Sequence, residues 1–464
     1  MRDYNLRLSP FHTLDTLSCH IKKCVNDHMR FEFCGLIQPE DEENFLNTGM
    51  EDIAVELSMV GEDGSEYLLC CGVARDIQIQ REGDLRRLSV EAVSGTYYED
   101  LVKYVRVFQD SSSTYDAVLK HNEKNYQDAG HSMMIGNGST IGDLVVQYRE
   151  TDWEFARRMA SHFNSVVVPA YRTKGIHYYF GFPDGKQNIE LSKCTYTIRK
   201  DAGDYLTKTK NQVLSLIEAD ALCLEVESRD VYEIGDSFPF QGQTYYIYEI
   251  ESVLDGRELV HHYKLRSKAA LQTIKQFNER MIGASLEANI SGVSKDTVQV
   301  NIAADGIQSN RKWFLYSTVY SSPDGTGWYC MPEEGDSVRL YLPNEKERDG
   351  YIISAVHVPA DGEARSTPDN KSLKSKYNKE VLFTPSLLRL TNNNGMTVEI
   401  LDDEGIVISS DKAVKIEATE GVQITSLEQS VEITAPESIE LMQGETTLTM
   451  KDDIHLNGAQ VHME

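Results

Sequence analysis

The chain has 464 residues, and its 73 acidic and 46 basic side chains give a formal net charge of −27. The length predicts about three domains, and the content of 40% hydrophobic and 26% charged residues is typical of a folded globular chain. Disordered and collagen-like chains are excluded. The negative charge argues against unspecific binding to nucleic acid or anionic membranes, because their phosphates would repel it.

The sequence lacks the patterns of membrane and secreted proteins. No stretch reaches the roughly 20 apolar residues that span a bilayer, and the N-terminus lacks the apolar core of a signal peptide. We therefore expect synthesis and assembly in the cytoplasm. The eight cysteines are scattered, without Cys-x-x-Cys pairs or histidines at metal spacing, so we expect reduced thiols and no zinc site.

Residues 1 to 275 are predicted to be mainly short strands separated by turns. Long hairpins are predicted from Val73 to Val93 and from Tyr245 to Leu265. Their likeness suggests a duplicated β-barrel unit, although any two hairpins look alike, so duplication and chance stay equally open.

Residues 96 to 165, within this part of the chain, are predicted to form a helical insert. Its clearest helix starts at Thr151, which forms with Glu154 the pattern of a capping box. The residues that follow at helical spacing, and that we expect to pack in the core, are Trp153, Ala156, Met159 and Phe163.

A third domain is predicted at residues 283 to 358, after a helical-looking stretch from Lys268 to Arg280. Five short strands with glycine turns suit a small closed barrel of the OB type. OB barrels often bind oligonucleotides through basic grooves. Acidic residues outnumber basic ones around Lys312 and Arg339, so nucleic-acid binding is the least favoured function.

The C-terminal region is predicted to consist of a polar linker or neck, residues 359 to 395, and a repetitive β segment, residues 396 to 464. In this segment two apolar residues separated by one recur at steps of eight or nine. The pairs are Val398/Ile400, Ile406/Ile408, Val414/Ile416, Val422/Ile424, Val431/Ile433, Ile439/Leu441 and Leu448/Met450. Because residues two apart lie on one face of a strand, the pattern predicts a tandem β repeat.

An eight-residue unit is long enough for one strand and one turn. One unit therefore forms only one side of a β-helix and not a complete coil. We therefore expect three identical chains to wind around one axis as an intertwined β-helix, with the apolar pairs meeting in a central seam. A single-chain β-solenoid of about three coils stays as the alternative. Either arrangement gives a rigid rod.

This order of parts, together with two sequence stretches, carries a resemblance to a known family. The stretches are Gln147–Ala160, with the sequence QYRETDWEFARRMA, and Gly327–Val338, with the sequence GWYCMPEEGDSV. The chain resembles the VgrG spike family of contractile injection systems, which fuses the hub and spike proteins of phage baseplates. The similarity covers nearly the whole chain.

The resemblance implies that residues 1 to 275 form a hub of two β-barrels. It also implies a homotrimer that caps an inner tube, adapts its sixfold symmetry to threefold symmetry and pierces a target envelope. The implied partners are the inner tube protein, baseplate proteins and a PAAR-like tip protein, with the target membrane contacted only during puncture. The particle that holds the chain would be delivered outside the cell. Phage tails, tailocins, extracellular particles and type VI secretion systems all stay open. No enzymatic activity, catalytic residue or cofactor is expected.

The alternative function is that of a trimeric β-helical tailspike, either an adhesin or a polysaccharide-degrading enzyme. It would need a groove with aromatic side chains and paired acids, and no aromatic residue follows Phe383. At the tip, His455 and His462 are weak candidates for metal ligands, because a trimer would arrange each as a ring of three imidazoles. We expect instead that a partner protein covers the last apolar layer.

Overall fold

The computed structural model describes residues 4–47, 54–61, 63–187, 194–211, 213, 215–304, 310–354 and 366–450. The chain divides into two units, Met1–Val358 and Pro359–Glu464. The described residues are mainly β and form several separate sheets. None of the helices in these ranges is both long enough and apolar enough to cross a membrane.

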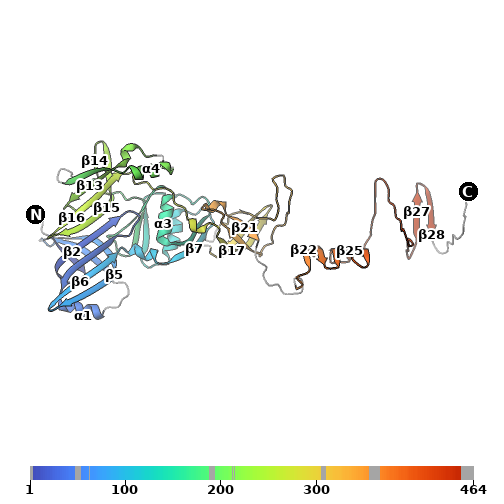
Figure 1. Cartoon of the computed structure of the whole chain (residues 1–464), viewed down its shortest axis with the longest axis horizontal. Coiled ribbons are helices and arrows are strands. Elements are labelled where there is room, and N and C mark those ends of the chain that lie inside the picture. The colour runs from blue at the N-terminus through green and yellow to red at the C-terminus, as the bar shows by residue number, and fades with distance from the viewer. Residues whose placement is uncertain are drawn as a thin grey trace. The chain divides into compact units, whose positions relative to one another are not determined.

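The first unit is built around an 11-stranded sheet with the order β1-β4-β5-β6-β3-β2-β15-β16-β13-β12, to which β14 adds by pairing with β15 (Figure 1). Its strands are β1 (Tyr4–Ser9), β2 (Thr13–Cys24), β3 (Arg30–Ile37), β4 (Ala54–Gly61), β5 (Glu66–Glu82), β6 (Leu85–Val93), β12 (Thr195–Lys200), β13 (Leu222–Ser228), β14 (Ser237–Phe240), β15 (Gln243–Asp255) and β16 (Glu258–Ser267). The connections contain α1 (Pro39–Asn47), α4 (Ala202–Lys210) and η3 (Glu218–Ala221).

Both predicted hairpins are present in this sheet. They are β5–β6 and β15–β16, and each turn contains a glycine with positive φ, Gly83 at 61° and Gly256 at 63°. Pairing between β2 and β15 joins the two halves, and their inner faces share one hydrophobic core. The two predicted barrels are therefore halves of one continuous sheet. The joining pair connects segments far apart in the sequence, which no local pattern encodes.

The predicted helical insert at residues 96 to 165 is only partly helical. It contains η1 (Gly95–Asp100), β7 (Lys103–Phe108), α2 (Tyr115–Glu123), β8 (Ala129–Met133), β9 (Val145–Thr151) and α3 (Asp152–Ser161). β7 pairs with β9, and β8 joins β10 (Val167–Pro169) and β11 (Ile176–Phe180) in a second small sheet. The strands were not predicted because short apolar runs buried on both sides, such as the start of β9, do not alternate.

Helix α3 begins with the predicted capping box, which the structure confirms. The backbone N–H of Glu154 donates to Thr151 Oγ1, and the backbone N–H of Thr151 donates to Glu154 Oε2, both at 3.0 Å. Arg280 also donates to both oxygens of Glu154 at 2.8 Å. This hydrogen-bonded ion pair lowers the pKa of the Glu154 carboxyl.

The predicted packing face of α3 contains three fully buried residues. Trp153 and Ala156 are 1% exposed and Met159 is 0% exposed, whereas Phe163 lies just beyond the helix and is partly buried. The Trp153 ring packs edge-on against Tyr178 of β11, with ring centroids 5.8 Å apart. This face therefore fixes the helix against the small sheet.

The stretch from Lys268 to Arg280 does not form the predicted helix. After β16 the chain makes a turn at residues 268–271 and then runs without helix or strand to η4 (Glu279–Met281), and two of its N–H groups bond near the end of α3. The backbone N–H of Thr273 donates to Asn164 O at 3.0 Å, and that of Gln276 donates to Ser161 Oγ at 2.8 Å. Partners in another segment replace intrahelical hydrogen bonds, so tertiary contacts override the local pattern.

Five strands lie within the predicted third domain at residues 283 to 358, in the order β19-β18-β17-β20-β21. They are β17 (Ser285–Ser294), β18 (Thr297–Ile302), β19 (Phe314–Leu315), β20 (Ser337–Tyr341) and β21 (Tyr351–Ser354), and η5 (Glu347–Asp349) precedes β21. A bridge between Tyr316 and Ile352 connects the two ends of the sheet. The five strands thus close on themselves as a small barrel.

A buried ion cluster joins this small barrel to α3. Arg158 donates to both carboxylate oxygens of Glu150 at 2.8 Å and to Glu347 Oε1 of η5 at 2.6 Å. The Arg158 side chain is only 3% exposed. Buried charges are tolerated only when they are paired, so the three side chains hold each other in place. Val107 and Val146 also pack into the barrel core, and Figure 1 shows α3 beside β7 and the barrel strands.

The second unit begins with a five-stranded antiparallel meander, in which each strand pairs with the next. Its strands are β22 (Lys371–Lys374), β23 (Glu380–Thr384), β24 (Leu387–Thr391), β25 (Met396–Leu401) and β26 (Gly405–Ser410), and a separate hairpin follows, β27 (Ile439–Gln443) and β28 (Thr446–Met450). The predicted neck at residues 359 to 395 was therefore wrong for its described part, which contains three strands. The apolar pairs of the meander start at Val381, Leu388 and Val398, at steps of seven and ten, so the first two pairs do not fit the repeat that begins at Val398.

We expect Trp153→Ala to destabilise the first unit by about 3–5 kcal/mol, because the substitution removes a large and fully buried ring. Chemical denaturation of the full chain, followed by tryptophan-independent circular dichroism, measures the change. Trp328→Ala is the matched control, since Trp328 is 60% exposed and its loss should change stability by no more than about 0.5 kcal/mol. Equal effects of the two substitutions would contradict the packing role of α3.

Candidate functional site

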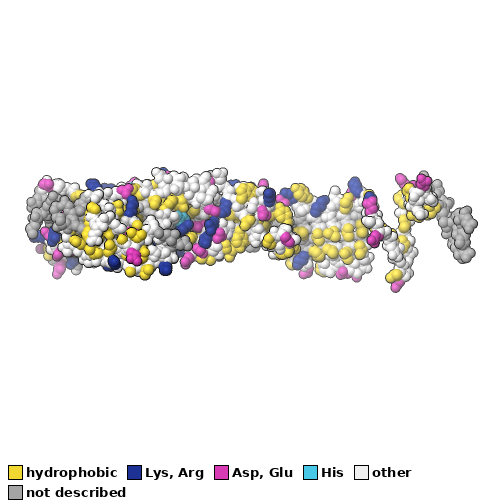
Figure 2. Space-filling view, turned by 90° about the horizontal axis from the view of Figure 1, so that it is seen from above, with side chains coloured by type: hydrophobic (Ala, Val, Ile, Leu, Met, Phe, Trp, Pro, Cys, Tyr) yellow, Lys and Arg dark blue, Asp and Glu magenta, His cyan; other side chains and the backbone are white. Residues whose placement is uncertain are grey.

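One face of the β22–β26 meander carries two rows of apolar side chains. Residues that are direct partners in an antiparallel sheet point to the same side, so the register defines each row. The first row crosses all five strands through Leu373, Val381, Leu390, Val398 and Ile408. The second row crosses four strands through Phe383, Leu388, Ile400 and Ile406. We call these nine side chains the apolar face, and Figure 2 shows hydrophobic side chains aligned in rows on this sheet.

The apolar face is not covered by the described part of the chain. Ile406 is 70% exposed, Ile408 is 62% exposed and Leu373 is 56% exposed. Complete burial of an aliphatic side chain contributes about 1.5–3 kcal/mol, so each half-exposed residue leaves on the order of 1 kcal/mol of stabilisation unrealised. A contiguous apolar surface of this kind marks an interaction site.

The opposite face of the same sheet carries charged and polar side chains together with four apolar ones, Leu382, Leu387, Leu401 and Val407. Arg389 Nε donates to Glu399 Oε1 at 2.6 Å across β24 and β25. Lys374 and Glu380 approach to 4.0 Å across β22 and β23. Such charged cross-strand pairs are stable in water. The meander is therefore more polar on this face than on the apolar face.

The structure brings together only some of the predicted seam residues. Val398, Ile400, Ile406 and Ile408 belong to the apolar face. The next six lie between β26 and β27, where no strand is described, and each is more than half exposed: Val414, Ile416, Val422, Ile424, Val431 and Ile433. The last four share one face of the β27–β28 hairpin: Ile439, Leu441, Leu448 and Met450.

Sequence reasoning missed five residues of the apolar face, because they lie in the segment predicted to be a neck. These are Leu373, Val381, Phe383, Leu388 and Leu390. The signal was present in part, since Val381/Phe383 and Leu388/Leu390 are also apolar pairs separated by one residue. These pairs were missed because the predicted repeat was defined by steps of eight or nine residues.

His455 and His462, the weak candidates for a metal at the tip, lie outside the described residues. Within the described ranges, no group of three or more His, Cys, Asp or Glu side chains is arranged to hold a metal ion.

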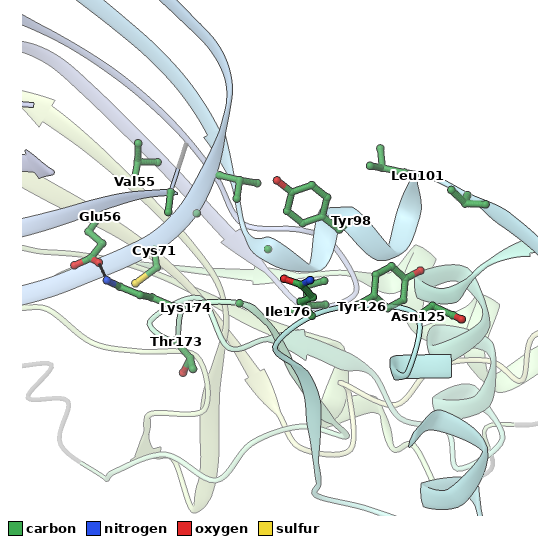
Figure 3. Close-up of a pocket in the computed structure, with 17 residues that line it drawn as sticks. Val55, Glu56, Cys71, Tyr98, Leu101, Asn125, Tyr126, Thr173, Lys174 and Ile176 are labelled. Carbon is green, nitrogen blue, oxygen red and sulfur yellow. Dashed lines mark ion pairs between the residues drawn. The ribbon is translucent and has the colours of Figure 1, made fainter. Parts of the chain in front are cut away.

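A pocket of about 620 Å³ lies in the first unit between β4, β5, η1 and the segments at residues 125–127 and 173–176 (Figure 3). Its walls are mainly apolar, and Glu56 and Lys174 form an ion pair at one end. Burial, together with the nearby Glu56 carboxylate, raises the pKa of Cys71 to about 11. The thiol is therefore protonated at neutral pH and is a poor nucleophile. The pocket is suited to apolar contacts and not to catalysis by this thiol.

A buried polar cluster lies near this pocket and serves packing. Asp152 accepts hydrogen bonds from Gln147 Nε2 at 2.8 Å and from Tyr126 Oη at 2.7 Å, and it also pairs with Arg106. Glu99 is 2% exposed, and one of its carboxyl oxygens has no hydrogen-bond partner among the described residues. Burial, and then the Asp152 and Glu123 carboxylates, raise the pKa of Glu99 well above its ordinary value of 4.5.

The raised pKa of Glu99 predicts a pH-dependent effect of Glu99→Gln. Near pH 4 the carboxyl is protonated in both the folded and the unfolded chain, so the substitution should change stability little. As the pH rises past 4.5, the unfolded carboxyl ionises first, and the folded wild type loses stability relative to the glutamine variant. The melting-temperature difference in favour of Glu99→Gln should therefore grow between pH 4 and pH 7.

Thermal unfolding of both proteins at several pH values measures this trend. Glu82→Gln, at an exposed strand end, controls for the loss of one negative charge. A difference that does not change with pH, or a variant less stable than the wild type at pH 7, would show that Glu99 is ionised in the folded chain.

Comparison with known proteins finds similarity in fold and not in sequence. No protein-family model and no curated protein matches the sequence. A chain of the Francisella PdpA–VgrG complex, in its half-lidded form, superposes with a TM-score of 0.57 at 10% identity, over 88% of this chain and 88% of that chain. The lidless form gives a TM-score of 0.55 at 9% identity, over 85% and 93%.

The E. coli c3393 protein, described as a component of the type VI secretion system with structural similarity to the T4 bacteriophage tail proteins gp27 and gp5, gives a TM-score of 0.51 at 12% identity. The match covers 75% of this chain and 99% of that chain. The resemblance drawn from the sequence is thus confirmed at the level of the fold.

Proposed function

We propose that the chain is the hub and spike subunit of a contractile injection system and that it acts as a homotrimer. The observation that carries the proposal is the apolar face, whose side chains are up to 70% exposed in the single chain and whose opposite side carries the Arg389–Glu399 ion pair. Three copies related by threefold symmetry bury these faces against each other around one axis. The fold shared with the type VI secretion structures supports the same assignment.

Each part of the chain has a distinct role in this proposal. The 11-stranded sheet has two halves, each centred on a long hairpin, so a trimer presents six similar units to a sixfold tube. The small five-stranded barrel is an OB-type domain that continues the spike. The second unit forms the needle, a trimeric β-helix that pierces the target envelope. The Arg158 cluster keeps the barrel fixed to the hub while the spike is driven forward.

The proposed partners are the inner tube protein, other baseplate proteins and a PAAR-like protein at the tip. A metal held by His455 or His462 is the alternative cap. We propose no nucleic-acid partner and no catalytic step, and the target membrane is contacted only during puncture. The chain is assembled in the cytoplasm and leaves the cell as part of an injection particle.

Two neighbouring residues of β26 test the trimer. Ile408 belongs to the apolar face, whereas Val407 lies on the opposite face, directly across from Glu399. In the assembled trimer, Ile408→Lys buries an uncompensated charge at a cost of about 3–5 kcal/mol per chain. Val407→Lys places a lysine beside a carboxylate in water and should change stability by no more than about 0.5 kcal/mol. Sedimentation velocity should show dissociation of the first variant only.

The exposure of the two residues makes this comparison decisive. In a single chain Ile408 is 62% exposed and Val407 is 37% exposed, so an isolated chain should tolerate lysine better at position 408. In the assembled trimer, by contrast, lysine should be tolerated better at position 407 than at position 408. If Val407→Lys is the more damaging substitution, or if Ile408→Lys sediments like the wild type, the apolar face does not lie in an interface.

A further inference from the structure

The turns at the two ends of the meander differ in charge. Because successive strands run in opposite directions, the β22–β23 and β24–β25 turns lie at one end of the sheet, and the β23–β24 and β25–β26 turns lie at the other. The β22–β23 connection, residues 374–379, contains three lysines: Lys374, Lys376 and Lys379. The β25–β26 turn contains three consecutive acids: Asp402, Asp403 and Glu404. We call residues 374–379 the lysine turn.

The lysine turn is exposed and contains no acidic residue. Every residue from 371 to 379 is exposed, and the first acid that follows, Glu380, lies 4.0 Å from Lys374. Tyr377, in the middle of the turn, is 72% exposed. Residues 396–450, by contrast, carry 12 acidic and only two basic side chains. The turn is therefore a local positive surface on a chain whose formal net charge is −27.

Hydrogen bonds hold the backbone of the lysine turn in one shape. The backbone N–H of Ser375 donates to Lys379 O at 2.9 Å, and that of Asn378 donates to Ser375 O at 3.0 Å. Asn378 has a φ of 59°, a conformation that asparagine tolerates better than most residues. Asn393 Nδ2, in the β24–β25 turn, donates to Asn378 O at 3.0 Å and connects the two neighbouring turns. The turn therefore needs little reorganisation of its backbone when it meets a partner.

The chemistry of the lysine turn fits an anionic lipid surface. Each lysine close to anionic headgroups strengthens binding about fivefold. Tyrosine suits the same place, because its ring enters the headgroup layer while its hydroxyl stays in water. A nucleic-acid duplex would also attract the lysines, but its phosphate backbone offers no such layer to Tyr377.

The acids of the β25–β26 turn do not cancel this attraction. They are separated from the lysine turn by the length of a five-residue strand such as β23. This length is roughly 17 Å, about twice the screening length of about 8 Å at physiological salt. The charges near the lysine turn, and not the net charge of the chain, therefore decide how this end of the sheet interacts with a membrane.

We propose that the lysine turn docks on the anionic lipid surface of the target membrane, with Tyr377 in the headgroup layer. This inference rests on the proposed function, which brings the spike to that membrane and places three copies of the turn on one particle. The acidic segment 396–450 follows the turn in the chain and is repelled by the same lipids. The needle therefore passes without adhering, and the lysine turn holds the spike at the membrane surface.

Co-sedimentation of the full chain with lipid vesicles tests this inference. Vesicles of phosphatidylglycerol and phosphatidylcholine in equal parts should bind the chain, and vesicles of phosphatidylcholine alone should not. Raising the salt to about 1 M, where the screening length is about 3 Å, should abolish binding. Replacing two lysines, Lys376→Gln and Lys379→Gln, should weaken binding about 25-fold or more. Tyr377→Ser should weaken it by a smaller factor.

The matched control removes the same charge from the first unit. Lys124→Gln with Lys210→Gln replaces two exposed lysines outside the turn, so this double variant should bind like the wild type. Equal binding by the two double variants would show that the attraction is not local to the lysine turn. Wild-type binding by Tyr377→Ser would exclude the proposed docking mode. Tighter binding of the turn to duplex DNA than to the vesicles would make nucleic acid its partner instead.

Sedimentation velocity without vesicles keeps this inference separate from the proposed function. A trimer that does not bind the anionic vesicles contradicts only the docking of the lysine turn. A wild-type chain that sediments as a monomer contradicts the proposed function and, with it, this inference.

Discussion

The structure depends on one physical constraint: the meander of the second unit is a single layer of sheet. A sheet has two faces, and a stable one covers an apolar face with a second layer. The described chain supplies no such layer, although the register aligns nine apolar side chains on one side and places the Arg389–Glu399 ion pair on the other. In the proposed trimer other copies of the chain supply this layer, and a face built from repeated apolar pairs suits such an arrangement.

The first unit differs from the meander, because residues of a single chain form its hydrophobic core. The halves of the 11-stranded sheet share one hydrophobic core, and α3 buries Trp153 and Met159 against the neighbouring strands. Arg158 then connects α3 to the small barrel through paired, buried charges. In the proposed spike, this first unit acts as a hub joined firmly to its barrel, and the apolar face of the second unit packs against other copies.

Sequence reasoning succeeded where structure is determined locally. The capping box at Thr151 and the hairpin turns at Gly83 and Gly256 depend on a few adjacent residues, so their patterns were readable. It failed where distant contacts decide, as in the non-helical stretch after β16, where two N–H groups bond near the end of α3. The apolar face was only half predicted, because cross-strand register, and not a fixed step, aligns Val381 with Leu390.

Electron cryo-microscopy of the purified chain tests the central claim most directly, because it shows both the number of copies and the direction in which the apolar face points. The account predicts a threefold-symmetric particle in which Leu390, Val398 and Ile408 face the axis and Arg389 faces solvent. A single chain, or an assembly in which these three side chains remain in contact with water, would contradict it.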